Sequence, residues 1–164
     1  MSFAVDVNVL LYASDSGSDC HAKAVAFLQK VATEPEICYL PWPTVMSYLR
    51  MATHPQIFAV PLSPAEAQGN IDRLLAMPHV RCVSEAEGFW PLYTQIAQEV
   101  PARGNLVPDA HIAAILKLHG IRTLYTRDRD FGRFAFLRVI DPLKGGTGKS
   151  RKRHTEDGAN VSGR

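Results

Sequence analysis

The chain has 164 residues, of which 46% are hydrophobic and 21% are charged, so its composition excludes disorder of the whole chain and fits one globular domain. The formal net charge of +2 is unevenly distributed, because residues 144–164 carry six basic and two acidic side chains whereas residues 1–143 carry twelve basic and fourteen acidic ones. The basic residues therefore do not indicate that the main part of the chain binds nucleic acid.

The first part of the chain alternates apolar runs with helical patterns. Residues 3–5 are a predicted strand, and the pattern becomes helical after Asp6. Ser18 or Asp19 can cap the next helix, and a second strand is predicted over residues 36–40. A helix is then predicted over residues 44–53, entered through Pro41 and Pro43 and ended before Pro55.

Two sequences with the pattern of a capping box follow. Ser63–Glu66 has proline at the first helical position and predicts a helix that ends at about Met77. The segment from Ser84 to Glu87 has the same pattern and predicts a helix that ends at about Val100. A third strand, residues 80–83, lies between these helices.

The last part of the chain repeats the alternation. Pro108 can start a helix that ends at Gly120, and strands are predicted over residues 121–126 and 137–141. Residues 127–134, between these strands, are predicted to form a tight loop or one helical turn. Strands that alternate with helices indicate an α/β fold with a mostly parallel sheet covered on both faces.

The chain is expected to comprise one domain, residues 1–143, and a basic tail, residues 144–164. The tail has one apolar side chain larger than alanine, Val161, so it is expected to be disordered. No apolar run approaches the roughly 18 residues that a membrane-spanning helix needs. The amino-terminal segment has no Lys or Arg and contains Asp6, unlike a signal peptide. We therefore expect a cytoplasmic protein without a membrane segment.

Acidic side chains follow predicted strands or begin predicted helices. Asp6 follows the first strand, Asp109 lies in the first turn of the helix that starts near Pro108, and Asp128 and Asp130 follow the fourth strand. In open parallel sheets, sites form beyond the carboxyl ends of the strands, where the strand order reverses. Carboxylates gathered there would repel one another, and Mg²⁺ or Mn²⁺ would remove that penalty.

A divalent cation in such a cluster can activate water and stabilise negative charge on a phosphate, so the pattern favours phosphoryl chemistry. Each acid taken alone also has a structural interpretation. Asp6 could be a helix cap, Asp109 could complement the helix dipole, and one acid of the pair Asp128 and Asp130 could form a turn or pair with Arg127, Arg129 or Arg133. Their joint occurrence is what indicates a metal site.

Three segments, "AVDVNVLLYA", "GNLVPDAHIAAI" and "TLYTRDRDFGRF", occur in an order and spacing that resemble the PIN-domain ribonuclease toxins of bacterial toxin–antitoxin modules, the VapC type. The resemblance covers about residues 3–143. It implies a three-layer α/β/α sandwich and Mg²⁺- or Mn²⁺-dependent cleavage of RNA, with transfer RNA the leading substrate. It also implies a homodimer and inhibition by a cognate antitoxin.

Carried over position by position, the resemblance implies that Asp6 and Asp109 are the principal metal ligands and that Asp128 is the last acidic position. Asn8 stands where the family often has a small polar residue beside the metal. One position departs from the family pattern, because Ser47 stands where many members have glutamate. This loss of a negative charge predicts weaker metal binding, for which Asp130 could compensate.

Other polar and aromatic residues have two interpretations each. Arg50 could contact a phosphate or form a surface ion pair. Trp42 and Tyr48 could stack on RNA bases, whereas Trp42 could equally serve packing or a dimer contact. His111 and His119 are expected to be structural or solvent-exposed, because water activated by a metal requires no imidazole.

The preferred hypothesis is a metal-dependent endoribonuclease toxin in which Asp6, Asp109 and Asp128 hold the cation and are catalytic. The alternative is a catalytically weak module of the same fold that binds RNA or the antitoxin, which the serine at position 47 favours. An aspartyl-phosphate phosphotransferase would have a second aspartate where this chain has Asn8. The basic tail could add salt-sensitive, non-specific affinity for RNA.

Overall fold

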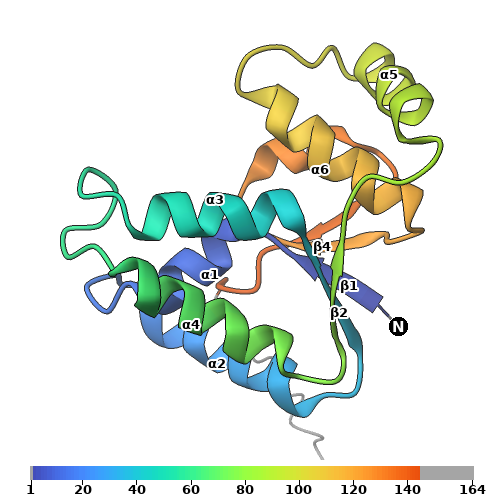
Figure 1. Ribbon diagram of the computed structural model, residues 1–164. Helices are drawn as coiled ribbons and strands as arrows, with labels where there is room; N and C mark the ends of the chain where they lie inside the picture. The colour runs from blue at the N-terminus through green and yellow to red at the C-terminus, as the bar shows by residue number, and fades with distance from the viewer. Residues whose placement is uncertain (1, 145–164) are drawn as a thin grey trace, which may run out of the picture.

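The structure, a computed structural model, describes residues 2–144 and is built on a central sheet of five strands (Figure 1). The strands lie in the order β3-β2-β1-β4-β5, and each neighbouring pair is parallel, as the alternating pattern predicted. The strands are β1 (Ser2–Val5), β2 (Ile37–Pro41), β3 (Val80–Val83), β4 (Thr123–Tyr125) and β5 (Arg138–Ile140).

Within the described residues, six α-helices and one short 3-10 helix connect the strands. Helices α1 to α4 share a core on one face of the sheet, and α5 and α6 cover the other face. The helices are α1 (Val7–Ser14), α2 (His21–Thr33), α3 (Trp42–Ala52), α4 (Pro64–Leu75), α5 (Phe89–Glu99), α6 (Leu106–Leu118) and the 3-10 helix η1 (Arg129–Arg133).

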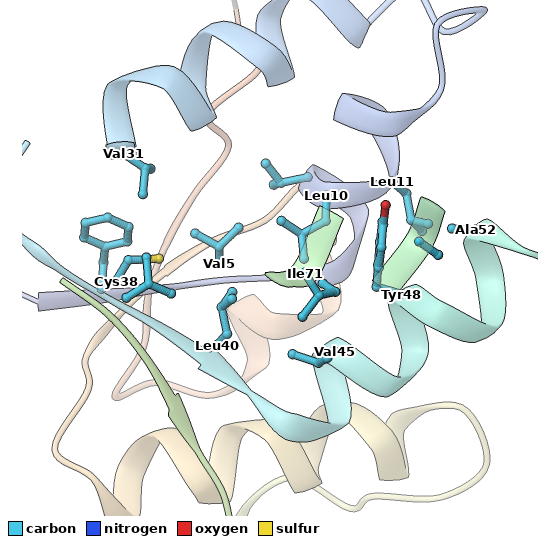
Figure 2. Packing of buried hydrophobic residues seen from close by; sticks show 14 of the residues in the cluster. Val5, Leu10, Leu11, Val31, Cys38, Leu40, Val45, Tyr48, Ala52 and Ile71 are labelled. Carbon is cyan, nitrogen blue, oxygen red and sulfur yellow. The ribbon is translucent and has the colours of Figure 1, made fainter. Parts of the chain in front are cut away.

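Side chains of the central strand alternate between two hydrophobic cores, because successive residues of a strand point to opposite faces. Phe3 and Val5 of β1 belong to the core shared with α1 to α4, and Figure 2 shows Val5 close to Leu10 of α1 and Leu40 of β2. Ala4 belongs to the opposite core, which includes Ile112 and other side chains of α6. The chain thus forms the expected three-layer α/β/α sandwich.

The order of the strands reverses between β1 and β4. From β1 the chain continues through β2 to β3 on one side, and β4 and β5 then extend the sheet on the other side. Ala4 is in register with both Tyr39 of β2 and Leu124 of β4, so the three strands end near one another. Loops that follow the carboxyl ends of β1 and β4 therefore lie together at the reversal, where parallel sheets form their sites.

The first predicted capping box is confirmed. The Ser63 hydroxyl accepts a hydrogen bond from the backbone N–H of Glu66 at 3.2 Å, and the Glu66 carboxylate accepts one from the N–H of Ser63 at 2.8 Å. These hydrogen bonds lower the pKa of the Glu66 carboxyl group. Helix α4 ends at Leu75, two residues before the predicted Met77.

The second predicted capping box is wrong. Helix α5 begins at Phe89, after Gly88 with φ of 84°, and no side chain caps it. The Ser84 hydroxyl donates to the carbonyl of Glu85, and the Glu85 carboxylate instead contacts His111 of α6. No local side-chain cap therefore forms. Glu85 contacts another helix, and α5 begins after Gly88 in the left-handed conformation.

Three further boundaries differ from the prediction. Helix α2 is capped at Cys20 without a side-chain hydrogen bond, so the predicted caps at Ser18 and Asp19 are wrong. Helices α3 and α6 each begin two residues earlier than predicted, at Trp42 and Leu106. The predicted single turn after β4 is confirmed as η1.

Residues 145–164, which include nearly all of the predicted disordered tail, lie outside the described residues, so that expectation stays a prediction. In the part of the chain that the structure describes, the longest helices have 13 residues, and none is long and apolar enough to cross a membrane.

The cap of α4 predicts a stability difference between two serines. Ser63→Ala removes an N-cap acceptor and is expected to lower the free energy of unfolding by about 1 kcal/mol, measured by urea denaturation. Ser84→Ala is the matched control, since the Ser84 hydroxyl caps no helix, and its effect is expected to stay below about 0.5 kcal/mol. Equal losses in the two variants would contradict this assignment of the caps.

Candidate active site

Asp6 joins the ends of the two strands at the reversal. Its backbone N–H donates to the carbonyl of Tyr125 at 3.0 Å, which ties the residue after β1 to β4. Its Oδ1 accepts from the N–H of Val7 at 2.7 Å, so Asp6 is the N-cap of α1. Only 4% of its surface is exposed. The helix-cap interpretation of Asp6 is therefore correct, and it coexists with a position at the sheet reversal.

The other oxygen of Asp6 is the centre of a small hydrogen-bond network. Asp6 Oδ2 accepts from Asn8 Nδ2 and from Thr126 Oγ1, each at 2.7 Å. The Thr126 hydroxyl in turn accepts from Asn8 Nδ2 at 2.8 Å and from the N–H of Asp128 at 2.9 Å. Asn8 Oδ1 accepts from the N–H of Arg127 at 3.2 Å. The network holds the Asp6 carboxylate and orients the loop that carries Asp128.

Three other carboxylates converge beside this network. Asp109 lies in the first turn of α6, Asp128 is the N-cap of η1, and Asp130 lies in the first turn of η1. One carboxylate oxygen from each of the three lies within 4.8 Å of the others. Asp128 Oδ1 accepts from the N–H of Asp130 at 2.8 Å, which fixes the two acids relative to each other. We call Asp109, Asp128 and Asp130 the acidic cluster.

The acidic cluster differs by one member from the set predicted from sequence. Asp109 and Asp128 come together as predicted, and the third member is Asp130, the residue expected only to compensate for Ser47. Asp6 lies outside the cluster, yet its charge raises the pKa of Asp109. The turn and ion-pair interpretation also holds for Asp130, whose Oδ1 lies 3.2 Å from Nε of Arg133.

Burial and mutual repulsion disfavour the charged forms of these acids. Desolvation raises the pKa of Asp109 to about 6, with further contributions from the charges of Asp128, Asp6 and Asp130. Burial also raises the pKa of Asp6, while hydrogen bonds from Thr126 and Val7 oppose the shift. A site that raises the pKa of its own carboxyl groups is one that a cation would stabilise.

The donors of the acidic cluster fit a hard divalent cation. All three are carboxylate oxygens, the ligand type of Mg²⁺ and Mn²⁺, and their mutual distances allow them to surround one ion. Oδ1 of Asp6 accepts one hydrogen bond and Oδ2 accepts two, so the carboxylate is held in one orientation. Pre-oriented ligands are typical of metal sites, since second-shell hydrogen bonds set ligand direction.

The structure gives different outcomes for the RNA contacts considered at Tyr48, Trp42 and Arg50. Tyr48 is 1% exposed, and its hydroxyl bonds to Ser14 and Asn70, so the prediction that it could stack on a base is wrong. Trp42 is 42% exposed at the start of α3 and stays available for a contact. Arg50 is exposed, and within residues 2–144 its side chain forms no recorded ion pair, so its surface-pair interpretation is not supported.

Both histidines considered from sequence, one on α6 and one at its C-cap, have structural contacts, as expected. His111 contacts the Glu85 carboxylate, and Nε2 of His119 lies 2.8 Å from the carbonyl oxygen of Ser84. Ser47 is half-buried on α3, and no residue in the described part of the chain supplies a carboxylate to the acidic cluster besides the three named.

Two residues of the site were not predicted from sequence. Thr126 was assigned only to the fourth strand, although its hydroxyl connects Asp6, Asn8 and Asp128. Arg127 was considered a partner for nearby acids of its own loop. It donates instead to Cys20 Sγ at 2.9 Å and pairs with Asp141 at 3.5 Å. The one sequence signal for a role of Thr126 is that it is a polar residue directly after a buried strand.

The raised pKa of Asp109 predicts a pH-dependent stability difference in metal-free protein. Unfolded Asp109 ionises near 3.8 and folded Asp109 near 6, so the folded state loses stability as the pH rises through this window. Asp109→Asn has no ionisable group at this position, so its free energy of unfolding should not show this decrease. A shift of about two pKa units corresponds to about 3 kcal/mol, which solvent screening at a half-exposed position reduces to about 1 kcal/mol.

The difference in unfolding free energy between Asp109→Asn and wild type, measured by urea denaturation in EDTA, is therefore expected to grow between pH 4.5 and pH 7.5. Glu87→Gln, in the exposed loop before α5, is the control and should show no such growth. A difference that is the same at both pH values would rule out the proposed origin of the shift.

Comparison with known proteins gives consistent results. A sequence model of the family described as PIN domain matches residues 3–137. Ribonuclease VapC48 of Mycobacterium tuberculosis is 45% identical over 145 residues, which cover 88% of this chain and 100% of the relative. Ribonuclease VapC43 of the same organism is 37% identical over 143 residues, which cover 87% and 97%.

A solved structure shares the fold. It is VapBC2 from Rickettsia felis bound to a DNA fragment from their promoter, with a TM-score of 0.62 at 16% identity over 85% of this chain and 98% of that one. The family match and the two relatives aligned over nearly their whole length confirm the resemblance drawn from the three sequence segments. The chain belongs to the PIN-domain family, as a VapC-type endoribonuclease toxin of a toxin–antitoxin system.

Proposed function

We propose that this chain hydrolyses RNA phosphodiesters with the help of Mg²⁺ or Mn²⁺, and that Asp6, Asp109 and Asp128 are its metal-holding and catalytic residues. The observation that carries the proposal is the convergence of carboxylates at the sheet reversal. Oxygens of Asp109, Asp128 and Asp130 lie within 4.8 Å of one another, and Asp6 lies outside this cluster but close enough for its charge to raise the pKa of Asp109. The raised pKa of Asp109 supports it, because unbalanced negative charge there favours a cation.

A bound divalent cation would lower the pKa of a water molecule and offset negative charge on the phosphate. The chain's own residues have distinct tasks. Asp109 and Asp128 offer oxygens from two different elements, one from α6 and one from the loop after β4. Asp6 is held in one orientation by hydrogen bonds from Val7, Asn8 and Thr126, and its charge acts on Asp109.

Asp130 is proposed as the compensating acid for Ser47. Its carboxylate lies in the acidic cluster, so a third oxygen is available there without a glutamate on α3. Its ion pair with Arg133 lowers the net negative charge of the cluster. We therefore propose one well-occupied ion rather than two.

The partners are also proposals. The substrate is RNA, with transfer RNA the first candidate, and the inhibitor is a cognate antitoxin. A homodimer is supported by apolar side chains left exposed on α5 and α6, where Trp90 is 67% and Val107 is 40% exposed. The site of action is the cytoplasm.

Replacing the proposed ligands tests the reaction. Asp6→Asn and Asp109→Asn are each expected to lower the rate of transfer RNA cleavage in Mg²⁺ by about a hundredfold or more, because each removes a charge that holds the cation. The rate is measured by gel electrophoresis, with circular dichroism to check the fold, and EDTA should stop the wild-type reaction. Full activity in either variant would overturn the mechanism. Wild-type protein that binds RNA without cleaving it in excess Mn²⁺ would favour the catalytically weak binding module.

The role of Asp130 is tested by metal affinity alone. Asp130→Asn is expected to weaken Mn²⁺ binding about tenfold, and Ser47→Glu to strengthen it, since affinity follows the number of charged ligands. Isothermal titration calorimetry measures both, with Glu87→Gln as the control. Unchanged affinity in Asp130→Asn would show that this acid does not compensate for Ser47.

A further inference from the structure

A polar hollow adjoins the acidic cluster and has no role in the proposed reaction so far. Its volume is about 500 Å³, and its lining includes Arg103, Asn105, Asp130 and Arg133. Arg103 and Asn105 come from the loop that leads into α6, and Asp130 and Arg133 come from η1. The hollow and the acidic cluster share Asp130. We call it the arginine hollow.

The charges of the arginine hollow are opposite in sign to those of the cluster. Arg133 is paired with Asp130 at 3.2 Å. Within residues 2–144, no acidic side chain forms an ion pair with Arg103. Two guanidinium groups against one carboxylate leave the hollow with an excess positive charge directly beside a group of acids.

A neutral side chain lies beside these charges. Asn105 is the N-cap of the 13-residue helix α6, and its side chain makes no capping hydrogen bond, so it is not tied to the helix backbone. The first backbone N–H groups of α6 offer nothing further, because those of Leu106 and Val107 donate to the carbonyls of Arg103 and Gly104 and Pro108 has none. The hollow thus combines two guanidinium groups and a side-chain amide, donors that suit a phosphate group.

We infer that the arginine hollow binds a backbone phosphate of the RNA strand next to the phosphodiester that is cleaved, and that Arg103 and Arg133 are positioning residues for the substrate. The inference rests on the proposed function, because it places the cleaved bond at the acidic cluster. One phosphate of the strand would then lie at the acidic cluster, where the cation would be held. The next phosphate along the strand would lie in the arginine hollow. Sharing of Asp130 by the two sites is the reason to assign RNA here rather than an acidic segment of the antitoxin.

The two arginines are expected to differ in their effects. Arg133 contacts a member of the acidic cluster, so its replacement also changes the charge around the cation. Arg103 has no recorded ion pair in the described chain, and its replacement should affect substrate binding alone. Arg103→Gln is therefore the informative variant.

Binding is measured first, on protein that cannot cleave. In an Asp109→Asn background, Arg103→Gln is expected to raise the Kd for a fluorescein-labelled single-stranded 12-nucleotide RNA about tenfold, measured by fluorescence anisotropy. The slope of log K against log salt concentration should fall by about 0.7, the value for one lost phosphate contact with a single strand. Arg122→Gln is the matched control, because Arg122 is also exposed but precedes β4, at the opposite end of the sheet.

Cleavage is measured second, with the active protein. Arg103→Gln should raise KM for transfer RNA several-fold and leave kcat close to wild type, since Arg103 does not touch the reacting phosphate. An unchanged Kd and salt slope, or the same loss in Arg122→Gln, would overturn the assignment. So would a loss of antitoxin binding with RNA binding unchanged.

The inference and the proposed function can fail separately. If wild-type protein does not cleave RNA in Mn²⁺ but Arg103→Gln still weakens RNA binding with the lower salt slope, the hollow is a phosphate site and the hydrolase proposal is wrong. If cleavage depends on Asp109 but Arg103→Gln has the wild-type Kd and KM, the hydrolase proposal stands and the assignment of the hollow is wrong.

Discussion

Repulsion among carboxylates is the constraint on which this structure depends. Asp109, Asp128 and Asp130 lie close together, and the buried charge of Asp6 acts on the same site. Hydrogen bonds from Asn8 and Thr126 hold Asp6 against this repulsion. The gathering of acids at the reversal of the sheet thus lowers stability, a cost that the proposed cation would offset. The rest of the fold, with its two hydrophobic cores, supplies the rigidity that this arrangement requires.

Most of the fold could be predicted because its signals are local. Five short apolar runs gave the five strands, and prolines marked where α3 and α4 begin. Ser63 and Ser84 show where local reasoning stops. Both stand three residues before a glutamate, yet the first caps a helix and the second does not. The difference lies in the contact between Glu85 and His111, which are distant in sequence, and in the positive φ of Gly88.

The candidate site could be predicted in part for the same reason. Asp6, Asp109 and Asp128 are candidates from sequence because each follows a strand or begins a helix and because each matches an acidic position of the family. Thr126 was missed because a threonine after a strand is common, and its role depends on the register in which β4 pairs with β1. Asp130 has a secondary role in the sequence analysis because the family resemblance matches Asp128 to the last acidic position. Its place in the acidic cluster depends on η1, which brings both acids close to Asp109.

The pairing of β1 with β4 has a consequence for synthesis of the protein. In the network around Asp6, Thr126 is bonded to Asn8 and to Asp6, from which it is separated by 118 and 120 positions along the chain. Contacts of such long range form only when both segments are present, and closing so large a loop is slow. Most of this chain must therefore leave the ribosome before the network around Asp6 can form, so the candidate site cannot assemble on an incomplete chain.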